Sequence, residues 1–380
     1  MIKRLLGDKI RRLFQQFPVV TVTGPRQSGK TTLCRSVFPD MPYVSLETPD
    51  DRDFARDDPR GFLARFPKGG IIDEVQRVPQ LTSYLQTLVD ETGKEGMFIL
   101  TGSQSFELMR SLGQSLAGRT AVLKLLPFSL AELTGSYAPR TYAEAIYKGF
   151  YPRIYDKKLD PLDAYSAYVS TYLERDLRNL LKVHNLGLFE TFLRLCAGRS
   201  GQILNLSSLG SDCGISHNTA REWLDLLETS FIVKRLPPWS RNLNKRLVKS
   251  PKLYFLDPGL ACHLLGMNSF RQVETHPLRG ALFETLVYSE LLKKRYNDGL
   301  PDNMCFFRDS NGNEVDFIVE DGTGFRCYEA KSSATVNPDF FTGLRRFSEL
   351  AKIKTTSFLV YAGKEAVTRE SIRITPWNAI

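Results

Sequence analysis

The chain has 380 residues, 42% of them apolar and 24% charged, a composition that is ordinary for a soluble globular protein of about two or three domains. No apolar stretch approaches the roughly 18 residues that a membrane-spanning helix needs, so we expect no membrane association. The net charge of +9 favours contact with nucleic acid, because basic surface supplies most sequence-independent affinity for it. The six cysteines form no C-x-x-C pair and no zinc spacing with the four histidines, which indicates reduced thiols in a cytoplasmic protein.

The N-terminal residues, 1–14, place apolar and basic side chains at helical spacing but lack the apolar core and cleavage site of a secretory signal. We expect a helix packed on the domain that follows. The next segment reads Gly24-Pro25-Arg26-Gln27-Ser28-Gly29-Lys30-Thr31, between a short apolar run at 19–22 and a helix-compatible stretch at 32–37. Its glycines let backbone N–H groups turn toward phosphate oxygens, Lys30 brings positive charge to them, and the Thr31 hydroxyl can hold Mg²⁺. The pattern predicts a phosphate-binding loop for ATP with Mg²⁺.

Two further strands are predicted to end in polar residues. Residues 69–72 are followed by Asp73 and Glu74, an arrangement in which the first acid supports Mg²⁺ and the second orients or deprotonates an attacking water. Residues 97–100 are followed by Thr101-Gly102-Ser103. The Ser103 hydroxyl either senses the γ-phosphate or lies in an ordinary turn at the end of the strand.

Arg119 follows in the segment 116–119, just before the apolar run 121–126. A guanidinium here either neutralises charge on the phosphoryl group of a neighbouring subunit or is merely solvated. The pair of acids at a strand end and the downstream arginine suit an ATPase better than a nucleotide kinase.

Five motifs together resemble a prokaryotic family of AAA-type ATPases whose C-terminal module was formerly of unknown function. They are 24–32, 72–76, 100–103, 116–119 and 126–133, and segments 172–177 and 280–284 extend the similarity over nearly the whole chain. The resemblance implies that the nucleotide is bound by Gly24, Pro25, Arg26, Gln27, Ser28, Gly29, Lys30, Thr31 and Thr32.

The same resemblance implies that Asp73 supports the metal, that Glu74 is the catalytic acid and that Ser103 is a sensor. It also implies that Arg119 reaches the ATP site of a neighbouring subunit, so that the subunits of a homo-oligomer share their ATP sites. One departure is visible, because relatives often show Gly-Gly where this chain has Gly149-Phe150 before Tyr151-Pro152. We therefore assign no second sensor, although Arg153 is a candidate.

Glycine- and proline-rich segments, which are typical of joints between domains, divide the chain into four predicted domains. The predicted fold class of the whole chain is α/β. Residues 1–138 are expected to form a parallel-sheet AAA-type P-loop ATPase domain, because strands alternate with helical stretches there. Residues 139–199 are expected to form a helical lid or connector, 200–266 a winged helix-turn-helix domain, and 267–380 a restriction-endonuclease-like α/β domain.

The predicted winged helix has a helix at 206–213, a glycine turn and a second helix from Ser216, which we expect to cap it. Segments 231–233 and 253–255 are expected to pair as the strands of the wing. The basic residues from 234 to 252 have no acidic residue among them and suit phosphate contact with DNA: Lys234, Arg235, Arg241, Lys245, Arg246, Lys249 and Lys252. The alternative is that such a module serves protein contacts and that the basic loop is solvated.

The C-terminal segment predicts strands at 306–308, 314–319 and 325–331. Period-two geometry places Glu329 and Lys331 on one face, where Asp316 and the helix-borne Glu284 would complete a site of three acids and one lysine. Grouped acids favour Mg²⁺, and Lys331 can orient the nucleophile. The pattern resembles the PD-(D/E)xK core of restriction endonucleases, either active or retained as a silent fold in which the lysine pairs with its acids.

Two function classes compete at this point. The first is an ATP-hydrolysing, DNA-binding enzyme that remodels or processes DNA, with an Mg²⁺-dependent nuclease activity if the C-terminal site cuts. The second is a nucleotide-controlled regulatory switch that binds DNA or protein and carries a silent nuclease fold. The sequence favours the enzyme, because Asp73, Glu74 and Arg119 make sense together only if hydrolysis matters.

Overall fold

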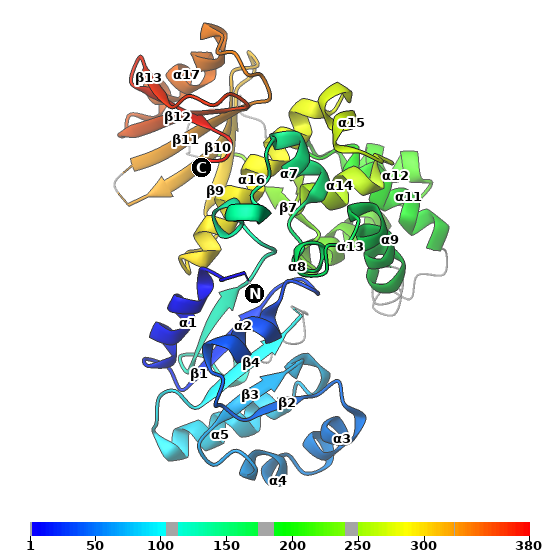
Figure 1. Ribbon diagram of the computed structural model, residues 1–380, viewed down its shortest axis with the longest axis vertical. Helices are drawn as coiled ribbons and strands as arrows, with labels where there is room; N and C mark the ends of the chain where they lie inside the picture. Colours follow the sequence, from blue (N-terminus) through cyan, green and yellow to red (C-terminus); the bar gives the residue numbers. More distant parts are fainter. Residues whose placement is uncertain (1, 104–112, 174–185, 240–249, 323) are drawn as a thin grey trace. The chain divides into compact units, whose positions relative to one another are not determined.

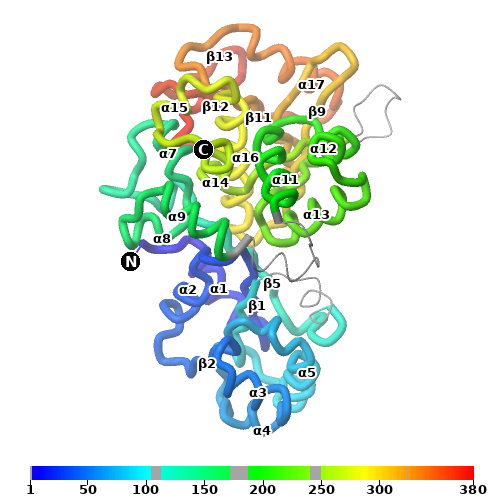
Figure 2. The backbone as a smooth tube through the Cα atoms, turned by 90° about the vertical axis from the view of Figure 1, so that its right-hand side faces the viewer, coloured from blue at the N-terminus to red at the C-terminus, as the bar shows by residue number. Residues whose placement is uncertain are grey.

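The computed structural model describes residues 2–103, 113–173, 186–239, 250–322 and 324–380. The chain forms two compact units (Figures 1 and 2). The first unit comprises residues 1–132 with the short segments 229–231 and 293–301, and the second comprises 133–228, 232–292 and 302–380. No helix in the described part of the chain has the length and apolar character needed to cross a membrane.

The first unit is built on a five-stranded sheet in the order β2-β3-β4-β1-β5, with every neighbouring pair parallel. Its strands are β1 (Val19–Thr23), β2 (Tyr43–Ser45), β3 (Gly70–Asp73), β4 (Phe98–Gly102) and β5 (Thr120–Lys124). The helices are α1 (Leu6–Phe14), α2 (Lys30–Val37), α3 (Pro49–Asp57), α4 (Pro59–Ala64) and α5 (Leu81–Thr92). The predicted parallel α/β domain is therefore confirmed.

Both faces of the sheet are covered at its central strands, because successive residues of β1, β3 and β4 join different apolar clusters. Ile71 and Ile99 pack with α1 and α2, whereas Ile72 and Leu100 pack with α3, α4 and α5. Side chains that alternate in this way are typical of parallel strands covered by helices on both sides. Strand β4 lies between β1 and β3, so the carboxyl ends of the three strands meet at one edge, where ligands bind in open α/β sheets.

The second unit begins with short helices that include α7 (Tyr142–Lys148), α8 (Pro152–Asp156), α9 (Pro161–Tyr168) and α11 (Leu186–Ala197). They are tied to α14 (Pro258–Leu264) by the buried Asp257 carboxylate, which accepts hydrogen bonds from the Tyr165 hydroxyl at 2.6 Å and the Phe150 N–H at 2.8 Å. A Cβ at Gly149 would collide with that tyrosine hydroxyl. Gly149 is therefore required by packing. Phe150, which departs from the Gly-Gly pattern, is fully buried, and the exposed Arg153 stays a candidate only.

The two helices predicted on either side of the glycine turn form as α12 (Leu206–Cys213) and α13 (His217–Thr229), and α11 lies beside α12 (Figure 2). The turn between them contains Gly214 at φ +74°, and the Ser216 hydroxyl accepts the Thr219 N–H at 3.1 Å, which confirms the predicted cap. The sheet beside them has the order β6-β8-β7 and consists of β6 (Gln202–Ile203), β7 (Val233–Leu236) and β8 (Lys252–Phe255). The two predicted strands pair antiparallel, with Val233 opposite Phe255.

The C-terminal part contains the three predicted strands within a six-stranded sheet of order β13-β14-β12-β11-β10-β9. Its elements are α16 (Arg279–Asn297), β9 (Met304–Arg308), β10 (Glu314–Asp321), β11 (Gly324–Lys331), α17 (Thr342–Ala351), β12 (Thr355–Tyr361), β13 (Val367–Arg369) and β14 (Ile372–Pro376). Strands β9, β10 and β11 are antiparallel, whereas β11, β12 and β14 are parallel. The pairing of β10 with β9 shifts register between Val315 and Ile318, the stretch that contains Asp316.

Candidate functional site

The phosphate-binding loop joins β1 to α2 at the carboxyl edge of the first sheet. Gly29 caps α2 at φ +89°, a left-handed conformation that favours glycine. A Cβ at Gly24 would collide with the backbone oxygen of Leu125 on the chain after β5. These two positions explain why the loop needs glycine at both ends, and they leave backbone N–H groups free to face phosphate oxygens at the start of α2.

Lys30 begins α2 and is only 5% exposed. Its ammonium donates to the carbonyl oxygens of Gly24 at 3.1 Å and Pro25 at 2.8 Å, so the side chain curls over the loop. Burial lowers the pKa of Lys30, while the neighbouring Glu74 and Asp73 oppose the shift. A phosphate would offer the buried ammonium a negative partner within reach of the same donors.

Asp73 is the centre of a hydroxyl cluster at the end of β3. Its carboxylate accepts hydrogen bonds from Thr31 at 3.1 and 3.0 Å, from Tyr43 at 3.0 Å, and from Thr101. Burial, followed by the charge of Asp73, raises the pKa of Tyr43 to about 12, which keeps that hydroxyl a donor. A carboxylate and a threonine hydroxyl within hydrogen-bond distance are the hard oxygen ligands that Mg²⁺ prefers beside nucleotide phosphates, so the residues fit the expected metal.

Tyr43 and Thr101 were not predicted as partners of Asp73. Thr101 stands two residues before the predicted sensor, and its place at the end of the neighbouring strand was the available signal. Tyr43 comes from β2, whose position beside β3 is not visible in the sequence. Both hydroxyls fix the carboxylate so that it faces Thr31.

Glu74 follows β3 in a left-handed conformation, at φ +58° and ψ +40°. This uncommon backbone turns the second acid away from the strand and marks a strained position of the kind found at active sites. The side-chain amide of Gln76 donates to one Glu74 carboxylate oxygen. Burial raises the pKa of Glu74, while Lys30 opposes the shift, so the carboxylate is a better proton acceptor than an exposed glutamate.

Ser103 and Arg119 have different surroundings. The Ser103 hydroxyl oxygen, just after β4, is buried and has no hydrogen-bond partner among the described residues, and its role as a sensor stays a prediction. Arg119 forms a two-pronged ion pair with Asp90 of α5, at 2.5 and 2.8 Å. That pair lies at the surface, and the role of Arg119 at the ATP site of a neighbouring subunit stays a prediction.

A buried guanidinium supports the phosphate-binding loop from beneath. Arg4 donates to the Ser28 carbonyl at 2.7 Å, to the Leu126 carbonyl at 2.7 Å, and to the Glu132 carboxylate at 3.0 Å. The fully buried Glu132 side chain also accepts the N–H groups of Leu5 and Ser129, each at 2.8 Å. The motif at 126–133 thus joins the N-terminal segment to the loop, which the sequence did not indicate.

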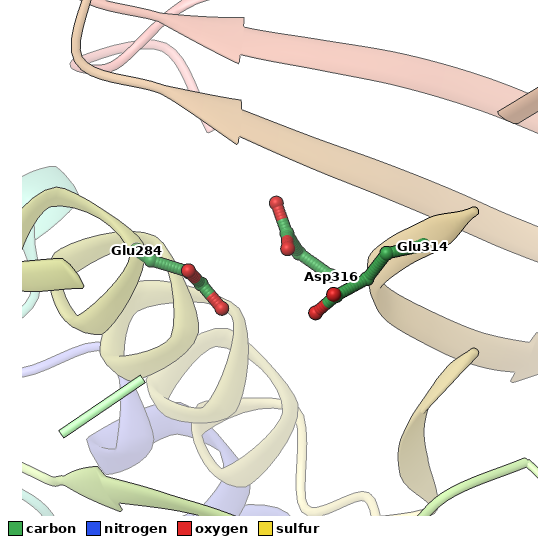
Figure 3. A group of neighbouring side chains, drawn as sticks. All are labelled: Glu284, Glu314 and Asp316. Carbon is green, nitrogen blue, oxygen red and sulfur yellow. The ribbon is translucent and has the colours of Figure 1, made fainter. Parts of the chain in front are cut away.

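The second candidate site lies in the C-terminal part. Glu284 of α16 points toward Glu314 and Asp316 of β10 (Figure 3). One ligand atom of each carboxylate lies within 4.8 Å of the others. Glu284 and Asp316 were predicted for this site, whereas Glu314 was missed, although its i, i+2 spacing from Asp316 places both on one face of a strand.

Lys252 of β8 occupies the centre of these acids. Its ammonium pairs with Glu284 at 2.7 Å, with Asp316 at 3.5 Å, and with Glu314. The side chain is 3% exposed. The structure therefore corrects the prediction that Lys252 contacts phosphate at the surface: a long side chain at the start of a buried strand has reached carboxylates far along the chain, which local charge does not reveal.

Glu329 and Lys331 lie on one face of β11 and pair with each other, as period-two geometry predicts. The second Glu329 oxygen is buried and has no partner among the described residues, and the Ala330 N–H donates to Asp316 at 2.9 Å. Glu329 and Lys331 line a pocket of about 660 Å³ together with the acids and Lys252. Burial and the nearby Asp316 raise the pKa of Glu284 to about 7, and they also raise the pKa of Glu329.

The other predicted DNA contacts divide into two sets. Lys234 pairs with Glu228 at 3.0 Å and Asp302 at 2.9 Å, and Arg235 pairs with Glu228 at 2.5 Å and Asp225 at 2.8 Å. Arg241, Lys245, Arg246 and Lys249 lie outside the described residues, as do positions 174–177 of the motif at 172–177. The two described cations thus already have acidic partners.

Comparison with known proteins divides the chain into three matched regions. Residues 16–134 match an AAA domain, 139–271 match a domain of unknown function (DUF8612), and 279–380 match another (DUF4143). Two uncharacterized proteins, from Mycobacterium bovis and Mycobacterium tuberculosis, are each 31% identical over 365 residues, which cover 95% of this chain and 80% of theirs.

Similar solved structures include a Walker-type ATPase of Pyrococcus abyssi and RuvB of Thermotoga maritima. The first has 14% identity and a TM-score of 0.44, and the match covers 70% of this chain and 96% of the other. The second has 17% identity and a TM-score of 0.28, and the match covers 61% of this chain and 87% of the other.

Proposed function

We propose that this chain, which belongs to the same family as its mycobacterial relatives, with an AAA domain followed by a DUF4143 domain, is an ATPase that acts on DNA. One observation supports the ATPase activity most directly: Lys30, Thr31, Asp73 and Glu74 lie together at the carboxyl edge of one parallel sheet. Charge-neutralising, metal-holding and proton-accepting groups stand together there. Phosphoryl transfer to water requires this set and little covalent chemistry.

Each residue of the set has a distinct task. Backbone N–H groups of the loop and the Lys30 ammonium bind and orient the β- and γ-phosphates. Thr31 and Asp73 would hold Mg²⁺, which would neutralise charge on the phosphate oxygens when bound with ATP. Glu74, held by Gln76, accepts the proton of the attacking water, and its burial-raised pKa suits that task.

The test is the pair of substitutions Lys30→Ala and Glu74→Gln, with Glu91→Gln at an exposed position of α5 as the matched control. Lys30→Ala should lose ATP binding. Glu74→Gln should bind ATP as the parent does yet turn over at least about a hundredfold more slowly. Hydrolysis by Glu74→Gln at the parental rate would show that Glu74 is not the base.

A shared ATP site in a homo-oligomer is the second part of the proposal. Arg119 supports it, because the guanidinium lies at the surface beside Asp90, where the γ-phosphate of a neighbouring subunit would compete with that carboxylate for it.

DNA binding is proposed for the segment 200–266. The element order β6-α12-α13-β7-β8, with α11 packed beside α12 and a capped second helix after a glycine turn, supports a winged helix. Because Lys234, Arg235 and Lys252 have acidic partners, we place the DNA contact on α13, whose exposed first turns carry Asn218 and Arg221. A recognition helix contacts base edges and phosphates with residues in this position.

The C-terminal part is proposed to have a restriction-endonuclease-like fold. The order α16-β9-β10-β11-α17-β12, with three antiparallel strands followed by a parallel one, supports this resemblance. The carboxylates of Glu284, Glu314 and Asp316 fit a divalent metal by type and by spacing. Bound there, Mg²⁺ would activate water and stabilise a departing phosphate oxygen.

A second candidate function is a nucleotide-controlled switch with a silent nuclease fold, and the position of Lys252 among the acids favours it. The two functions are separated by incubating the protein with single-stranded, duplex, forked and four-way DNA in Mg²⁺ or Mn²⁺. Cleavage that Asp316→Ala abolishes, while the ATPase rate is kept, supports the nuclease. Absence of cleavage on the whole panel supports the switch.

A further inference from the structure

We propose that Lys252 is a built-in cation that holds the acidic site closed to divalent metal, so that metal can enter only when the strand carrying this lysine lets its side chain withdraw. The inference rests on the proposed restriction-type site. It states that the position of the metal among the acids of that site is occupied by a side chain of the same protein, the Lys252 ammonium. The segment that provides it, β8, belongs to the sheet beside the proposed DNA-binding helices.

The first support is the match between the ammonium and the acids. An ammonium has three N–H donors, and the Lys252 ammonium contacts one oxygen each of Glu284, Glu314 and Asp316. Those residues are also the group whose ligand atoms lie close enough together for one metal ion. A divalent ion and an ammonium would repel each other and compete for the same oxygens, so their binding is mutually exclusive.

The second support is the depth and fit of the lysine. Its side chain is 3% exposed, and its ammonium lies 5.5 Å from the centre of the Phe306 ring. The Tyr254 hydroxyl, two residues along β8, donates to the same Glu284 oxygen. A buried lysine is costly without partners, and here its partners are the acids, which would repel each other without it.

Lys331 does not play this part. Its side chain is 32% exposed and pairs with Glu329. The two lysines therefore have separate acids, and Lys252 is the one at the position of the metal. Because Lys252 starts β8, opposite Leu236 of β7, an event that displaces the end of β8 would also open the acidic site.

The experiment measures Mn²⁺ binding to the nucleotide-free full chain by calorimetry and electron paramagnetic resonance. Lys252→Met should bind Mn²⁺ at least about tenfold more tightly than the parent, because the competing charge is gone. Lys252→Arg keeps the charge and should bind as weakly as the parent. Lys234→Met is the matched control, since Lys234 also pairs with two acids but lies outside the site.

Adding Asp316→Ala to Lys252→Met should abolish the gained binding and so assign it to this site rather than to the nucleotide site. If Lys252→Met fails to fold, Lys252→Met with Glu314→Gln is compared with Glu314→Gln alone, and the same tightening is expected.

Two outcomes overturn the proposal and are distinguishable. If parent and Lys252→Met bind Mn²⁺ equally tightly and Asp316→Ala removes both, the metal site stands but Lys252 does not close it. If neither protein binds Mn²⁺ in an Asp316-dependent way, the restriction-type metal site falls together with the inference.

Discussion

The buried pair of Arg4 and Glu132 makes a quantitative prediction about the phosphate-binding loop. Arg4→Met keeps the volume of the aliphatic stem but removes the donors that hold the Ser28 and Leu126 carbonyls. It also leaves the fully buried Glu132 charge without its partner. Breaking a buried ion pair by removing one member costs about 3–5 kcal/mol, because the remaining charge stays desolvated.

The assay is thermal unfolding of the full chain with and without nucleotide. A unit of this size loses about 3 °C of unfolding temperature per kcal/mol, so the transition of the first unit should fall by roughly 10–15 °C. ATP affinity should fall as well, since the Ser28 carbonyl loses its fixed partner beneath the loop. Arg11→Met is the control, because Arg11 pairs with Asp8 at an exposed position, and it should change stability by less than about 1 kcal/mol.

A double-mutant cycle isolates the interaction. Glu132→Gln combined with Arg4→Met should be less destabilising than the sum of the single changes, by at least about 1 kcal/mol. Arg4→Lys should fall between parent and Arg4→Met, because an ammonium keeps the charge but cannot make the forked contacts of a guanidinium. If Arg4→Met melts at the same temperature as Arg11→Met, the contacts of Arg4 with Glu132 and with the Ser28 carbonyl do not stabilise the loop.

Three further predictions concern the proposed activity. Because burial raises the pKa of Glu74, this carboxylate is protonated at higher pH than an ordinary glutamate. The ATPase rate should therefore fall, as pH decreases, at a pH above the ordinary glutamate pKa. A fall at the ordinary glutamate pKa would contradict the assignment of Glu74 as the base. Arg119→Ala should bind ATP normally yet hydrolyse it slowly, and mixing it with Glu74→Gln should restore part of the turnover; no restoration would leave Arg119 acting within its own chain or not at all. Arg221→Ala should weaken binding to all DNA sequences and reduce the log–log salt slope by about one, and an unchanged slope would move the DNA path away from α13.

The nucleotide site was largely predictable because its chemistry is contiguous in sequence. Strand, glycine loop and helix occur within twenty residues or so, and the rule that parallel strands meet at their carboxyl ends brings Asp73 beside Thr31. The glycine turn and the Ser216 cap were predictable for the same reason, since caps and turns depend on neighbours in the chain.

Contacts between distant segments could not be read in this way. Arg4 and Glu132 are separated by 128 positions, and Tyr43 reaches Asp73 only because β2 lies beside β3. Lys252 was misassigned for the same physical reason: a long flexible side chain in a basic stretch gives no sign of whether its ammonium reaches water or a buried carboxylate. Glu314 was the one omission with a local signal, because it stands two residues before Asp316 on the same strand.

The same lysine predicts how the protein responds to removal of metal. If the Lys252 ammonium already occupies the place of the metal among Glu284, Glu314 and Asp316, a chelator should leave the unfolding temperature of the nucleotide-free parent within about 1 °C of its value in Mn²⁺. Lys252→Met lacks that internal charge, so it should melt lower in chelator and recover on addition of Mn²⁺, by about 2.7 kcal/mol at a hundredfold excess over the dissociation constant. Differential scanning fluorimetry of both proteins in both buffers measures this directly. A parent that gains many degrees from Mn²⁺, through a site that Asp316→Ala removes, would mean that the metal and not Lys252 is the resident cation.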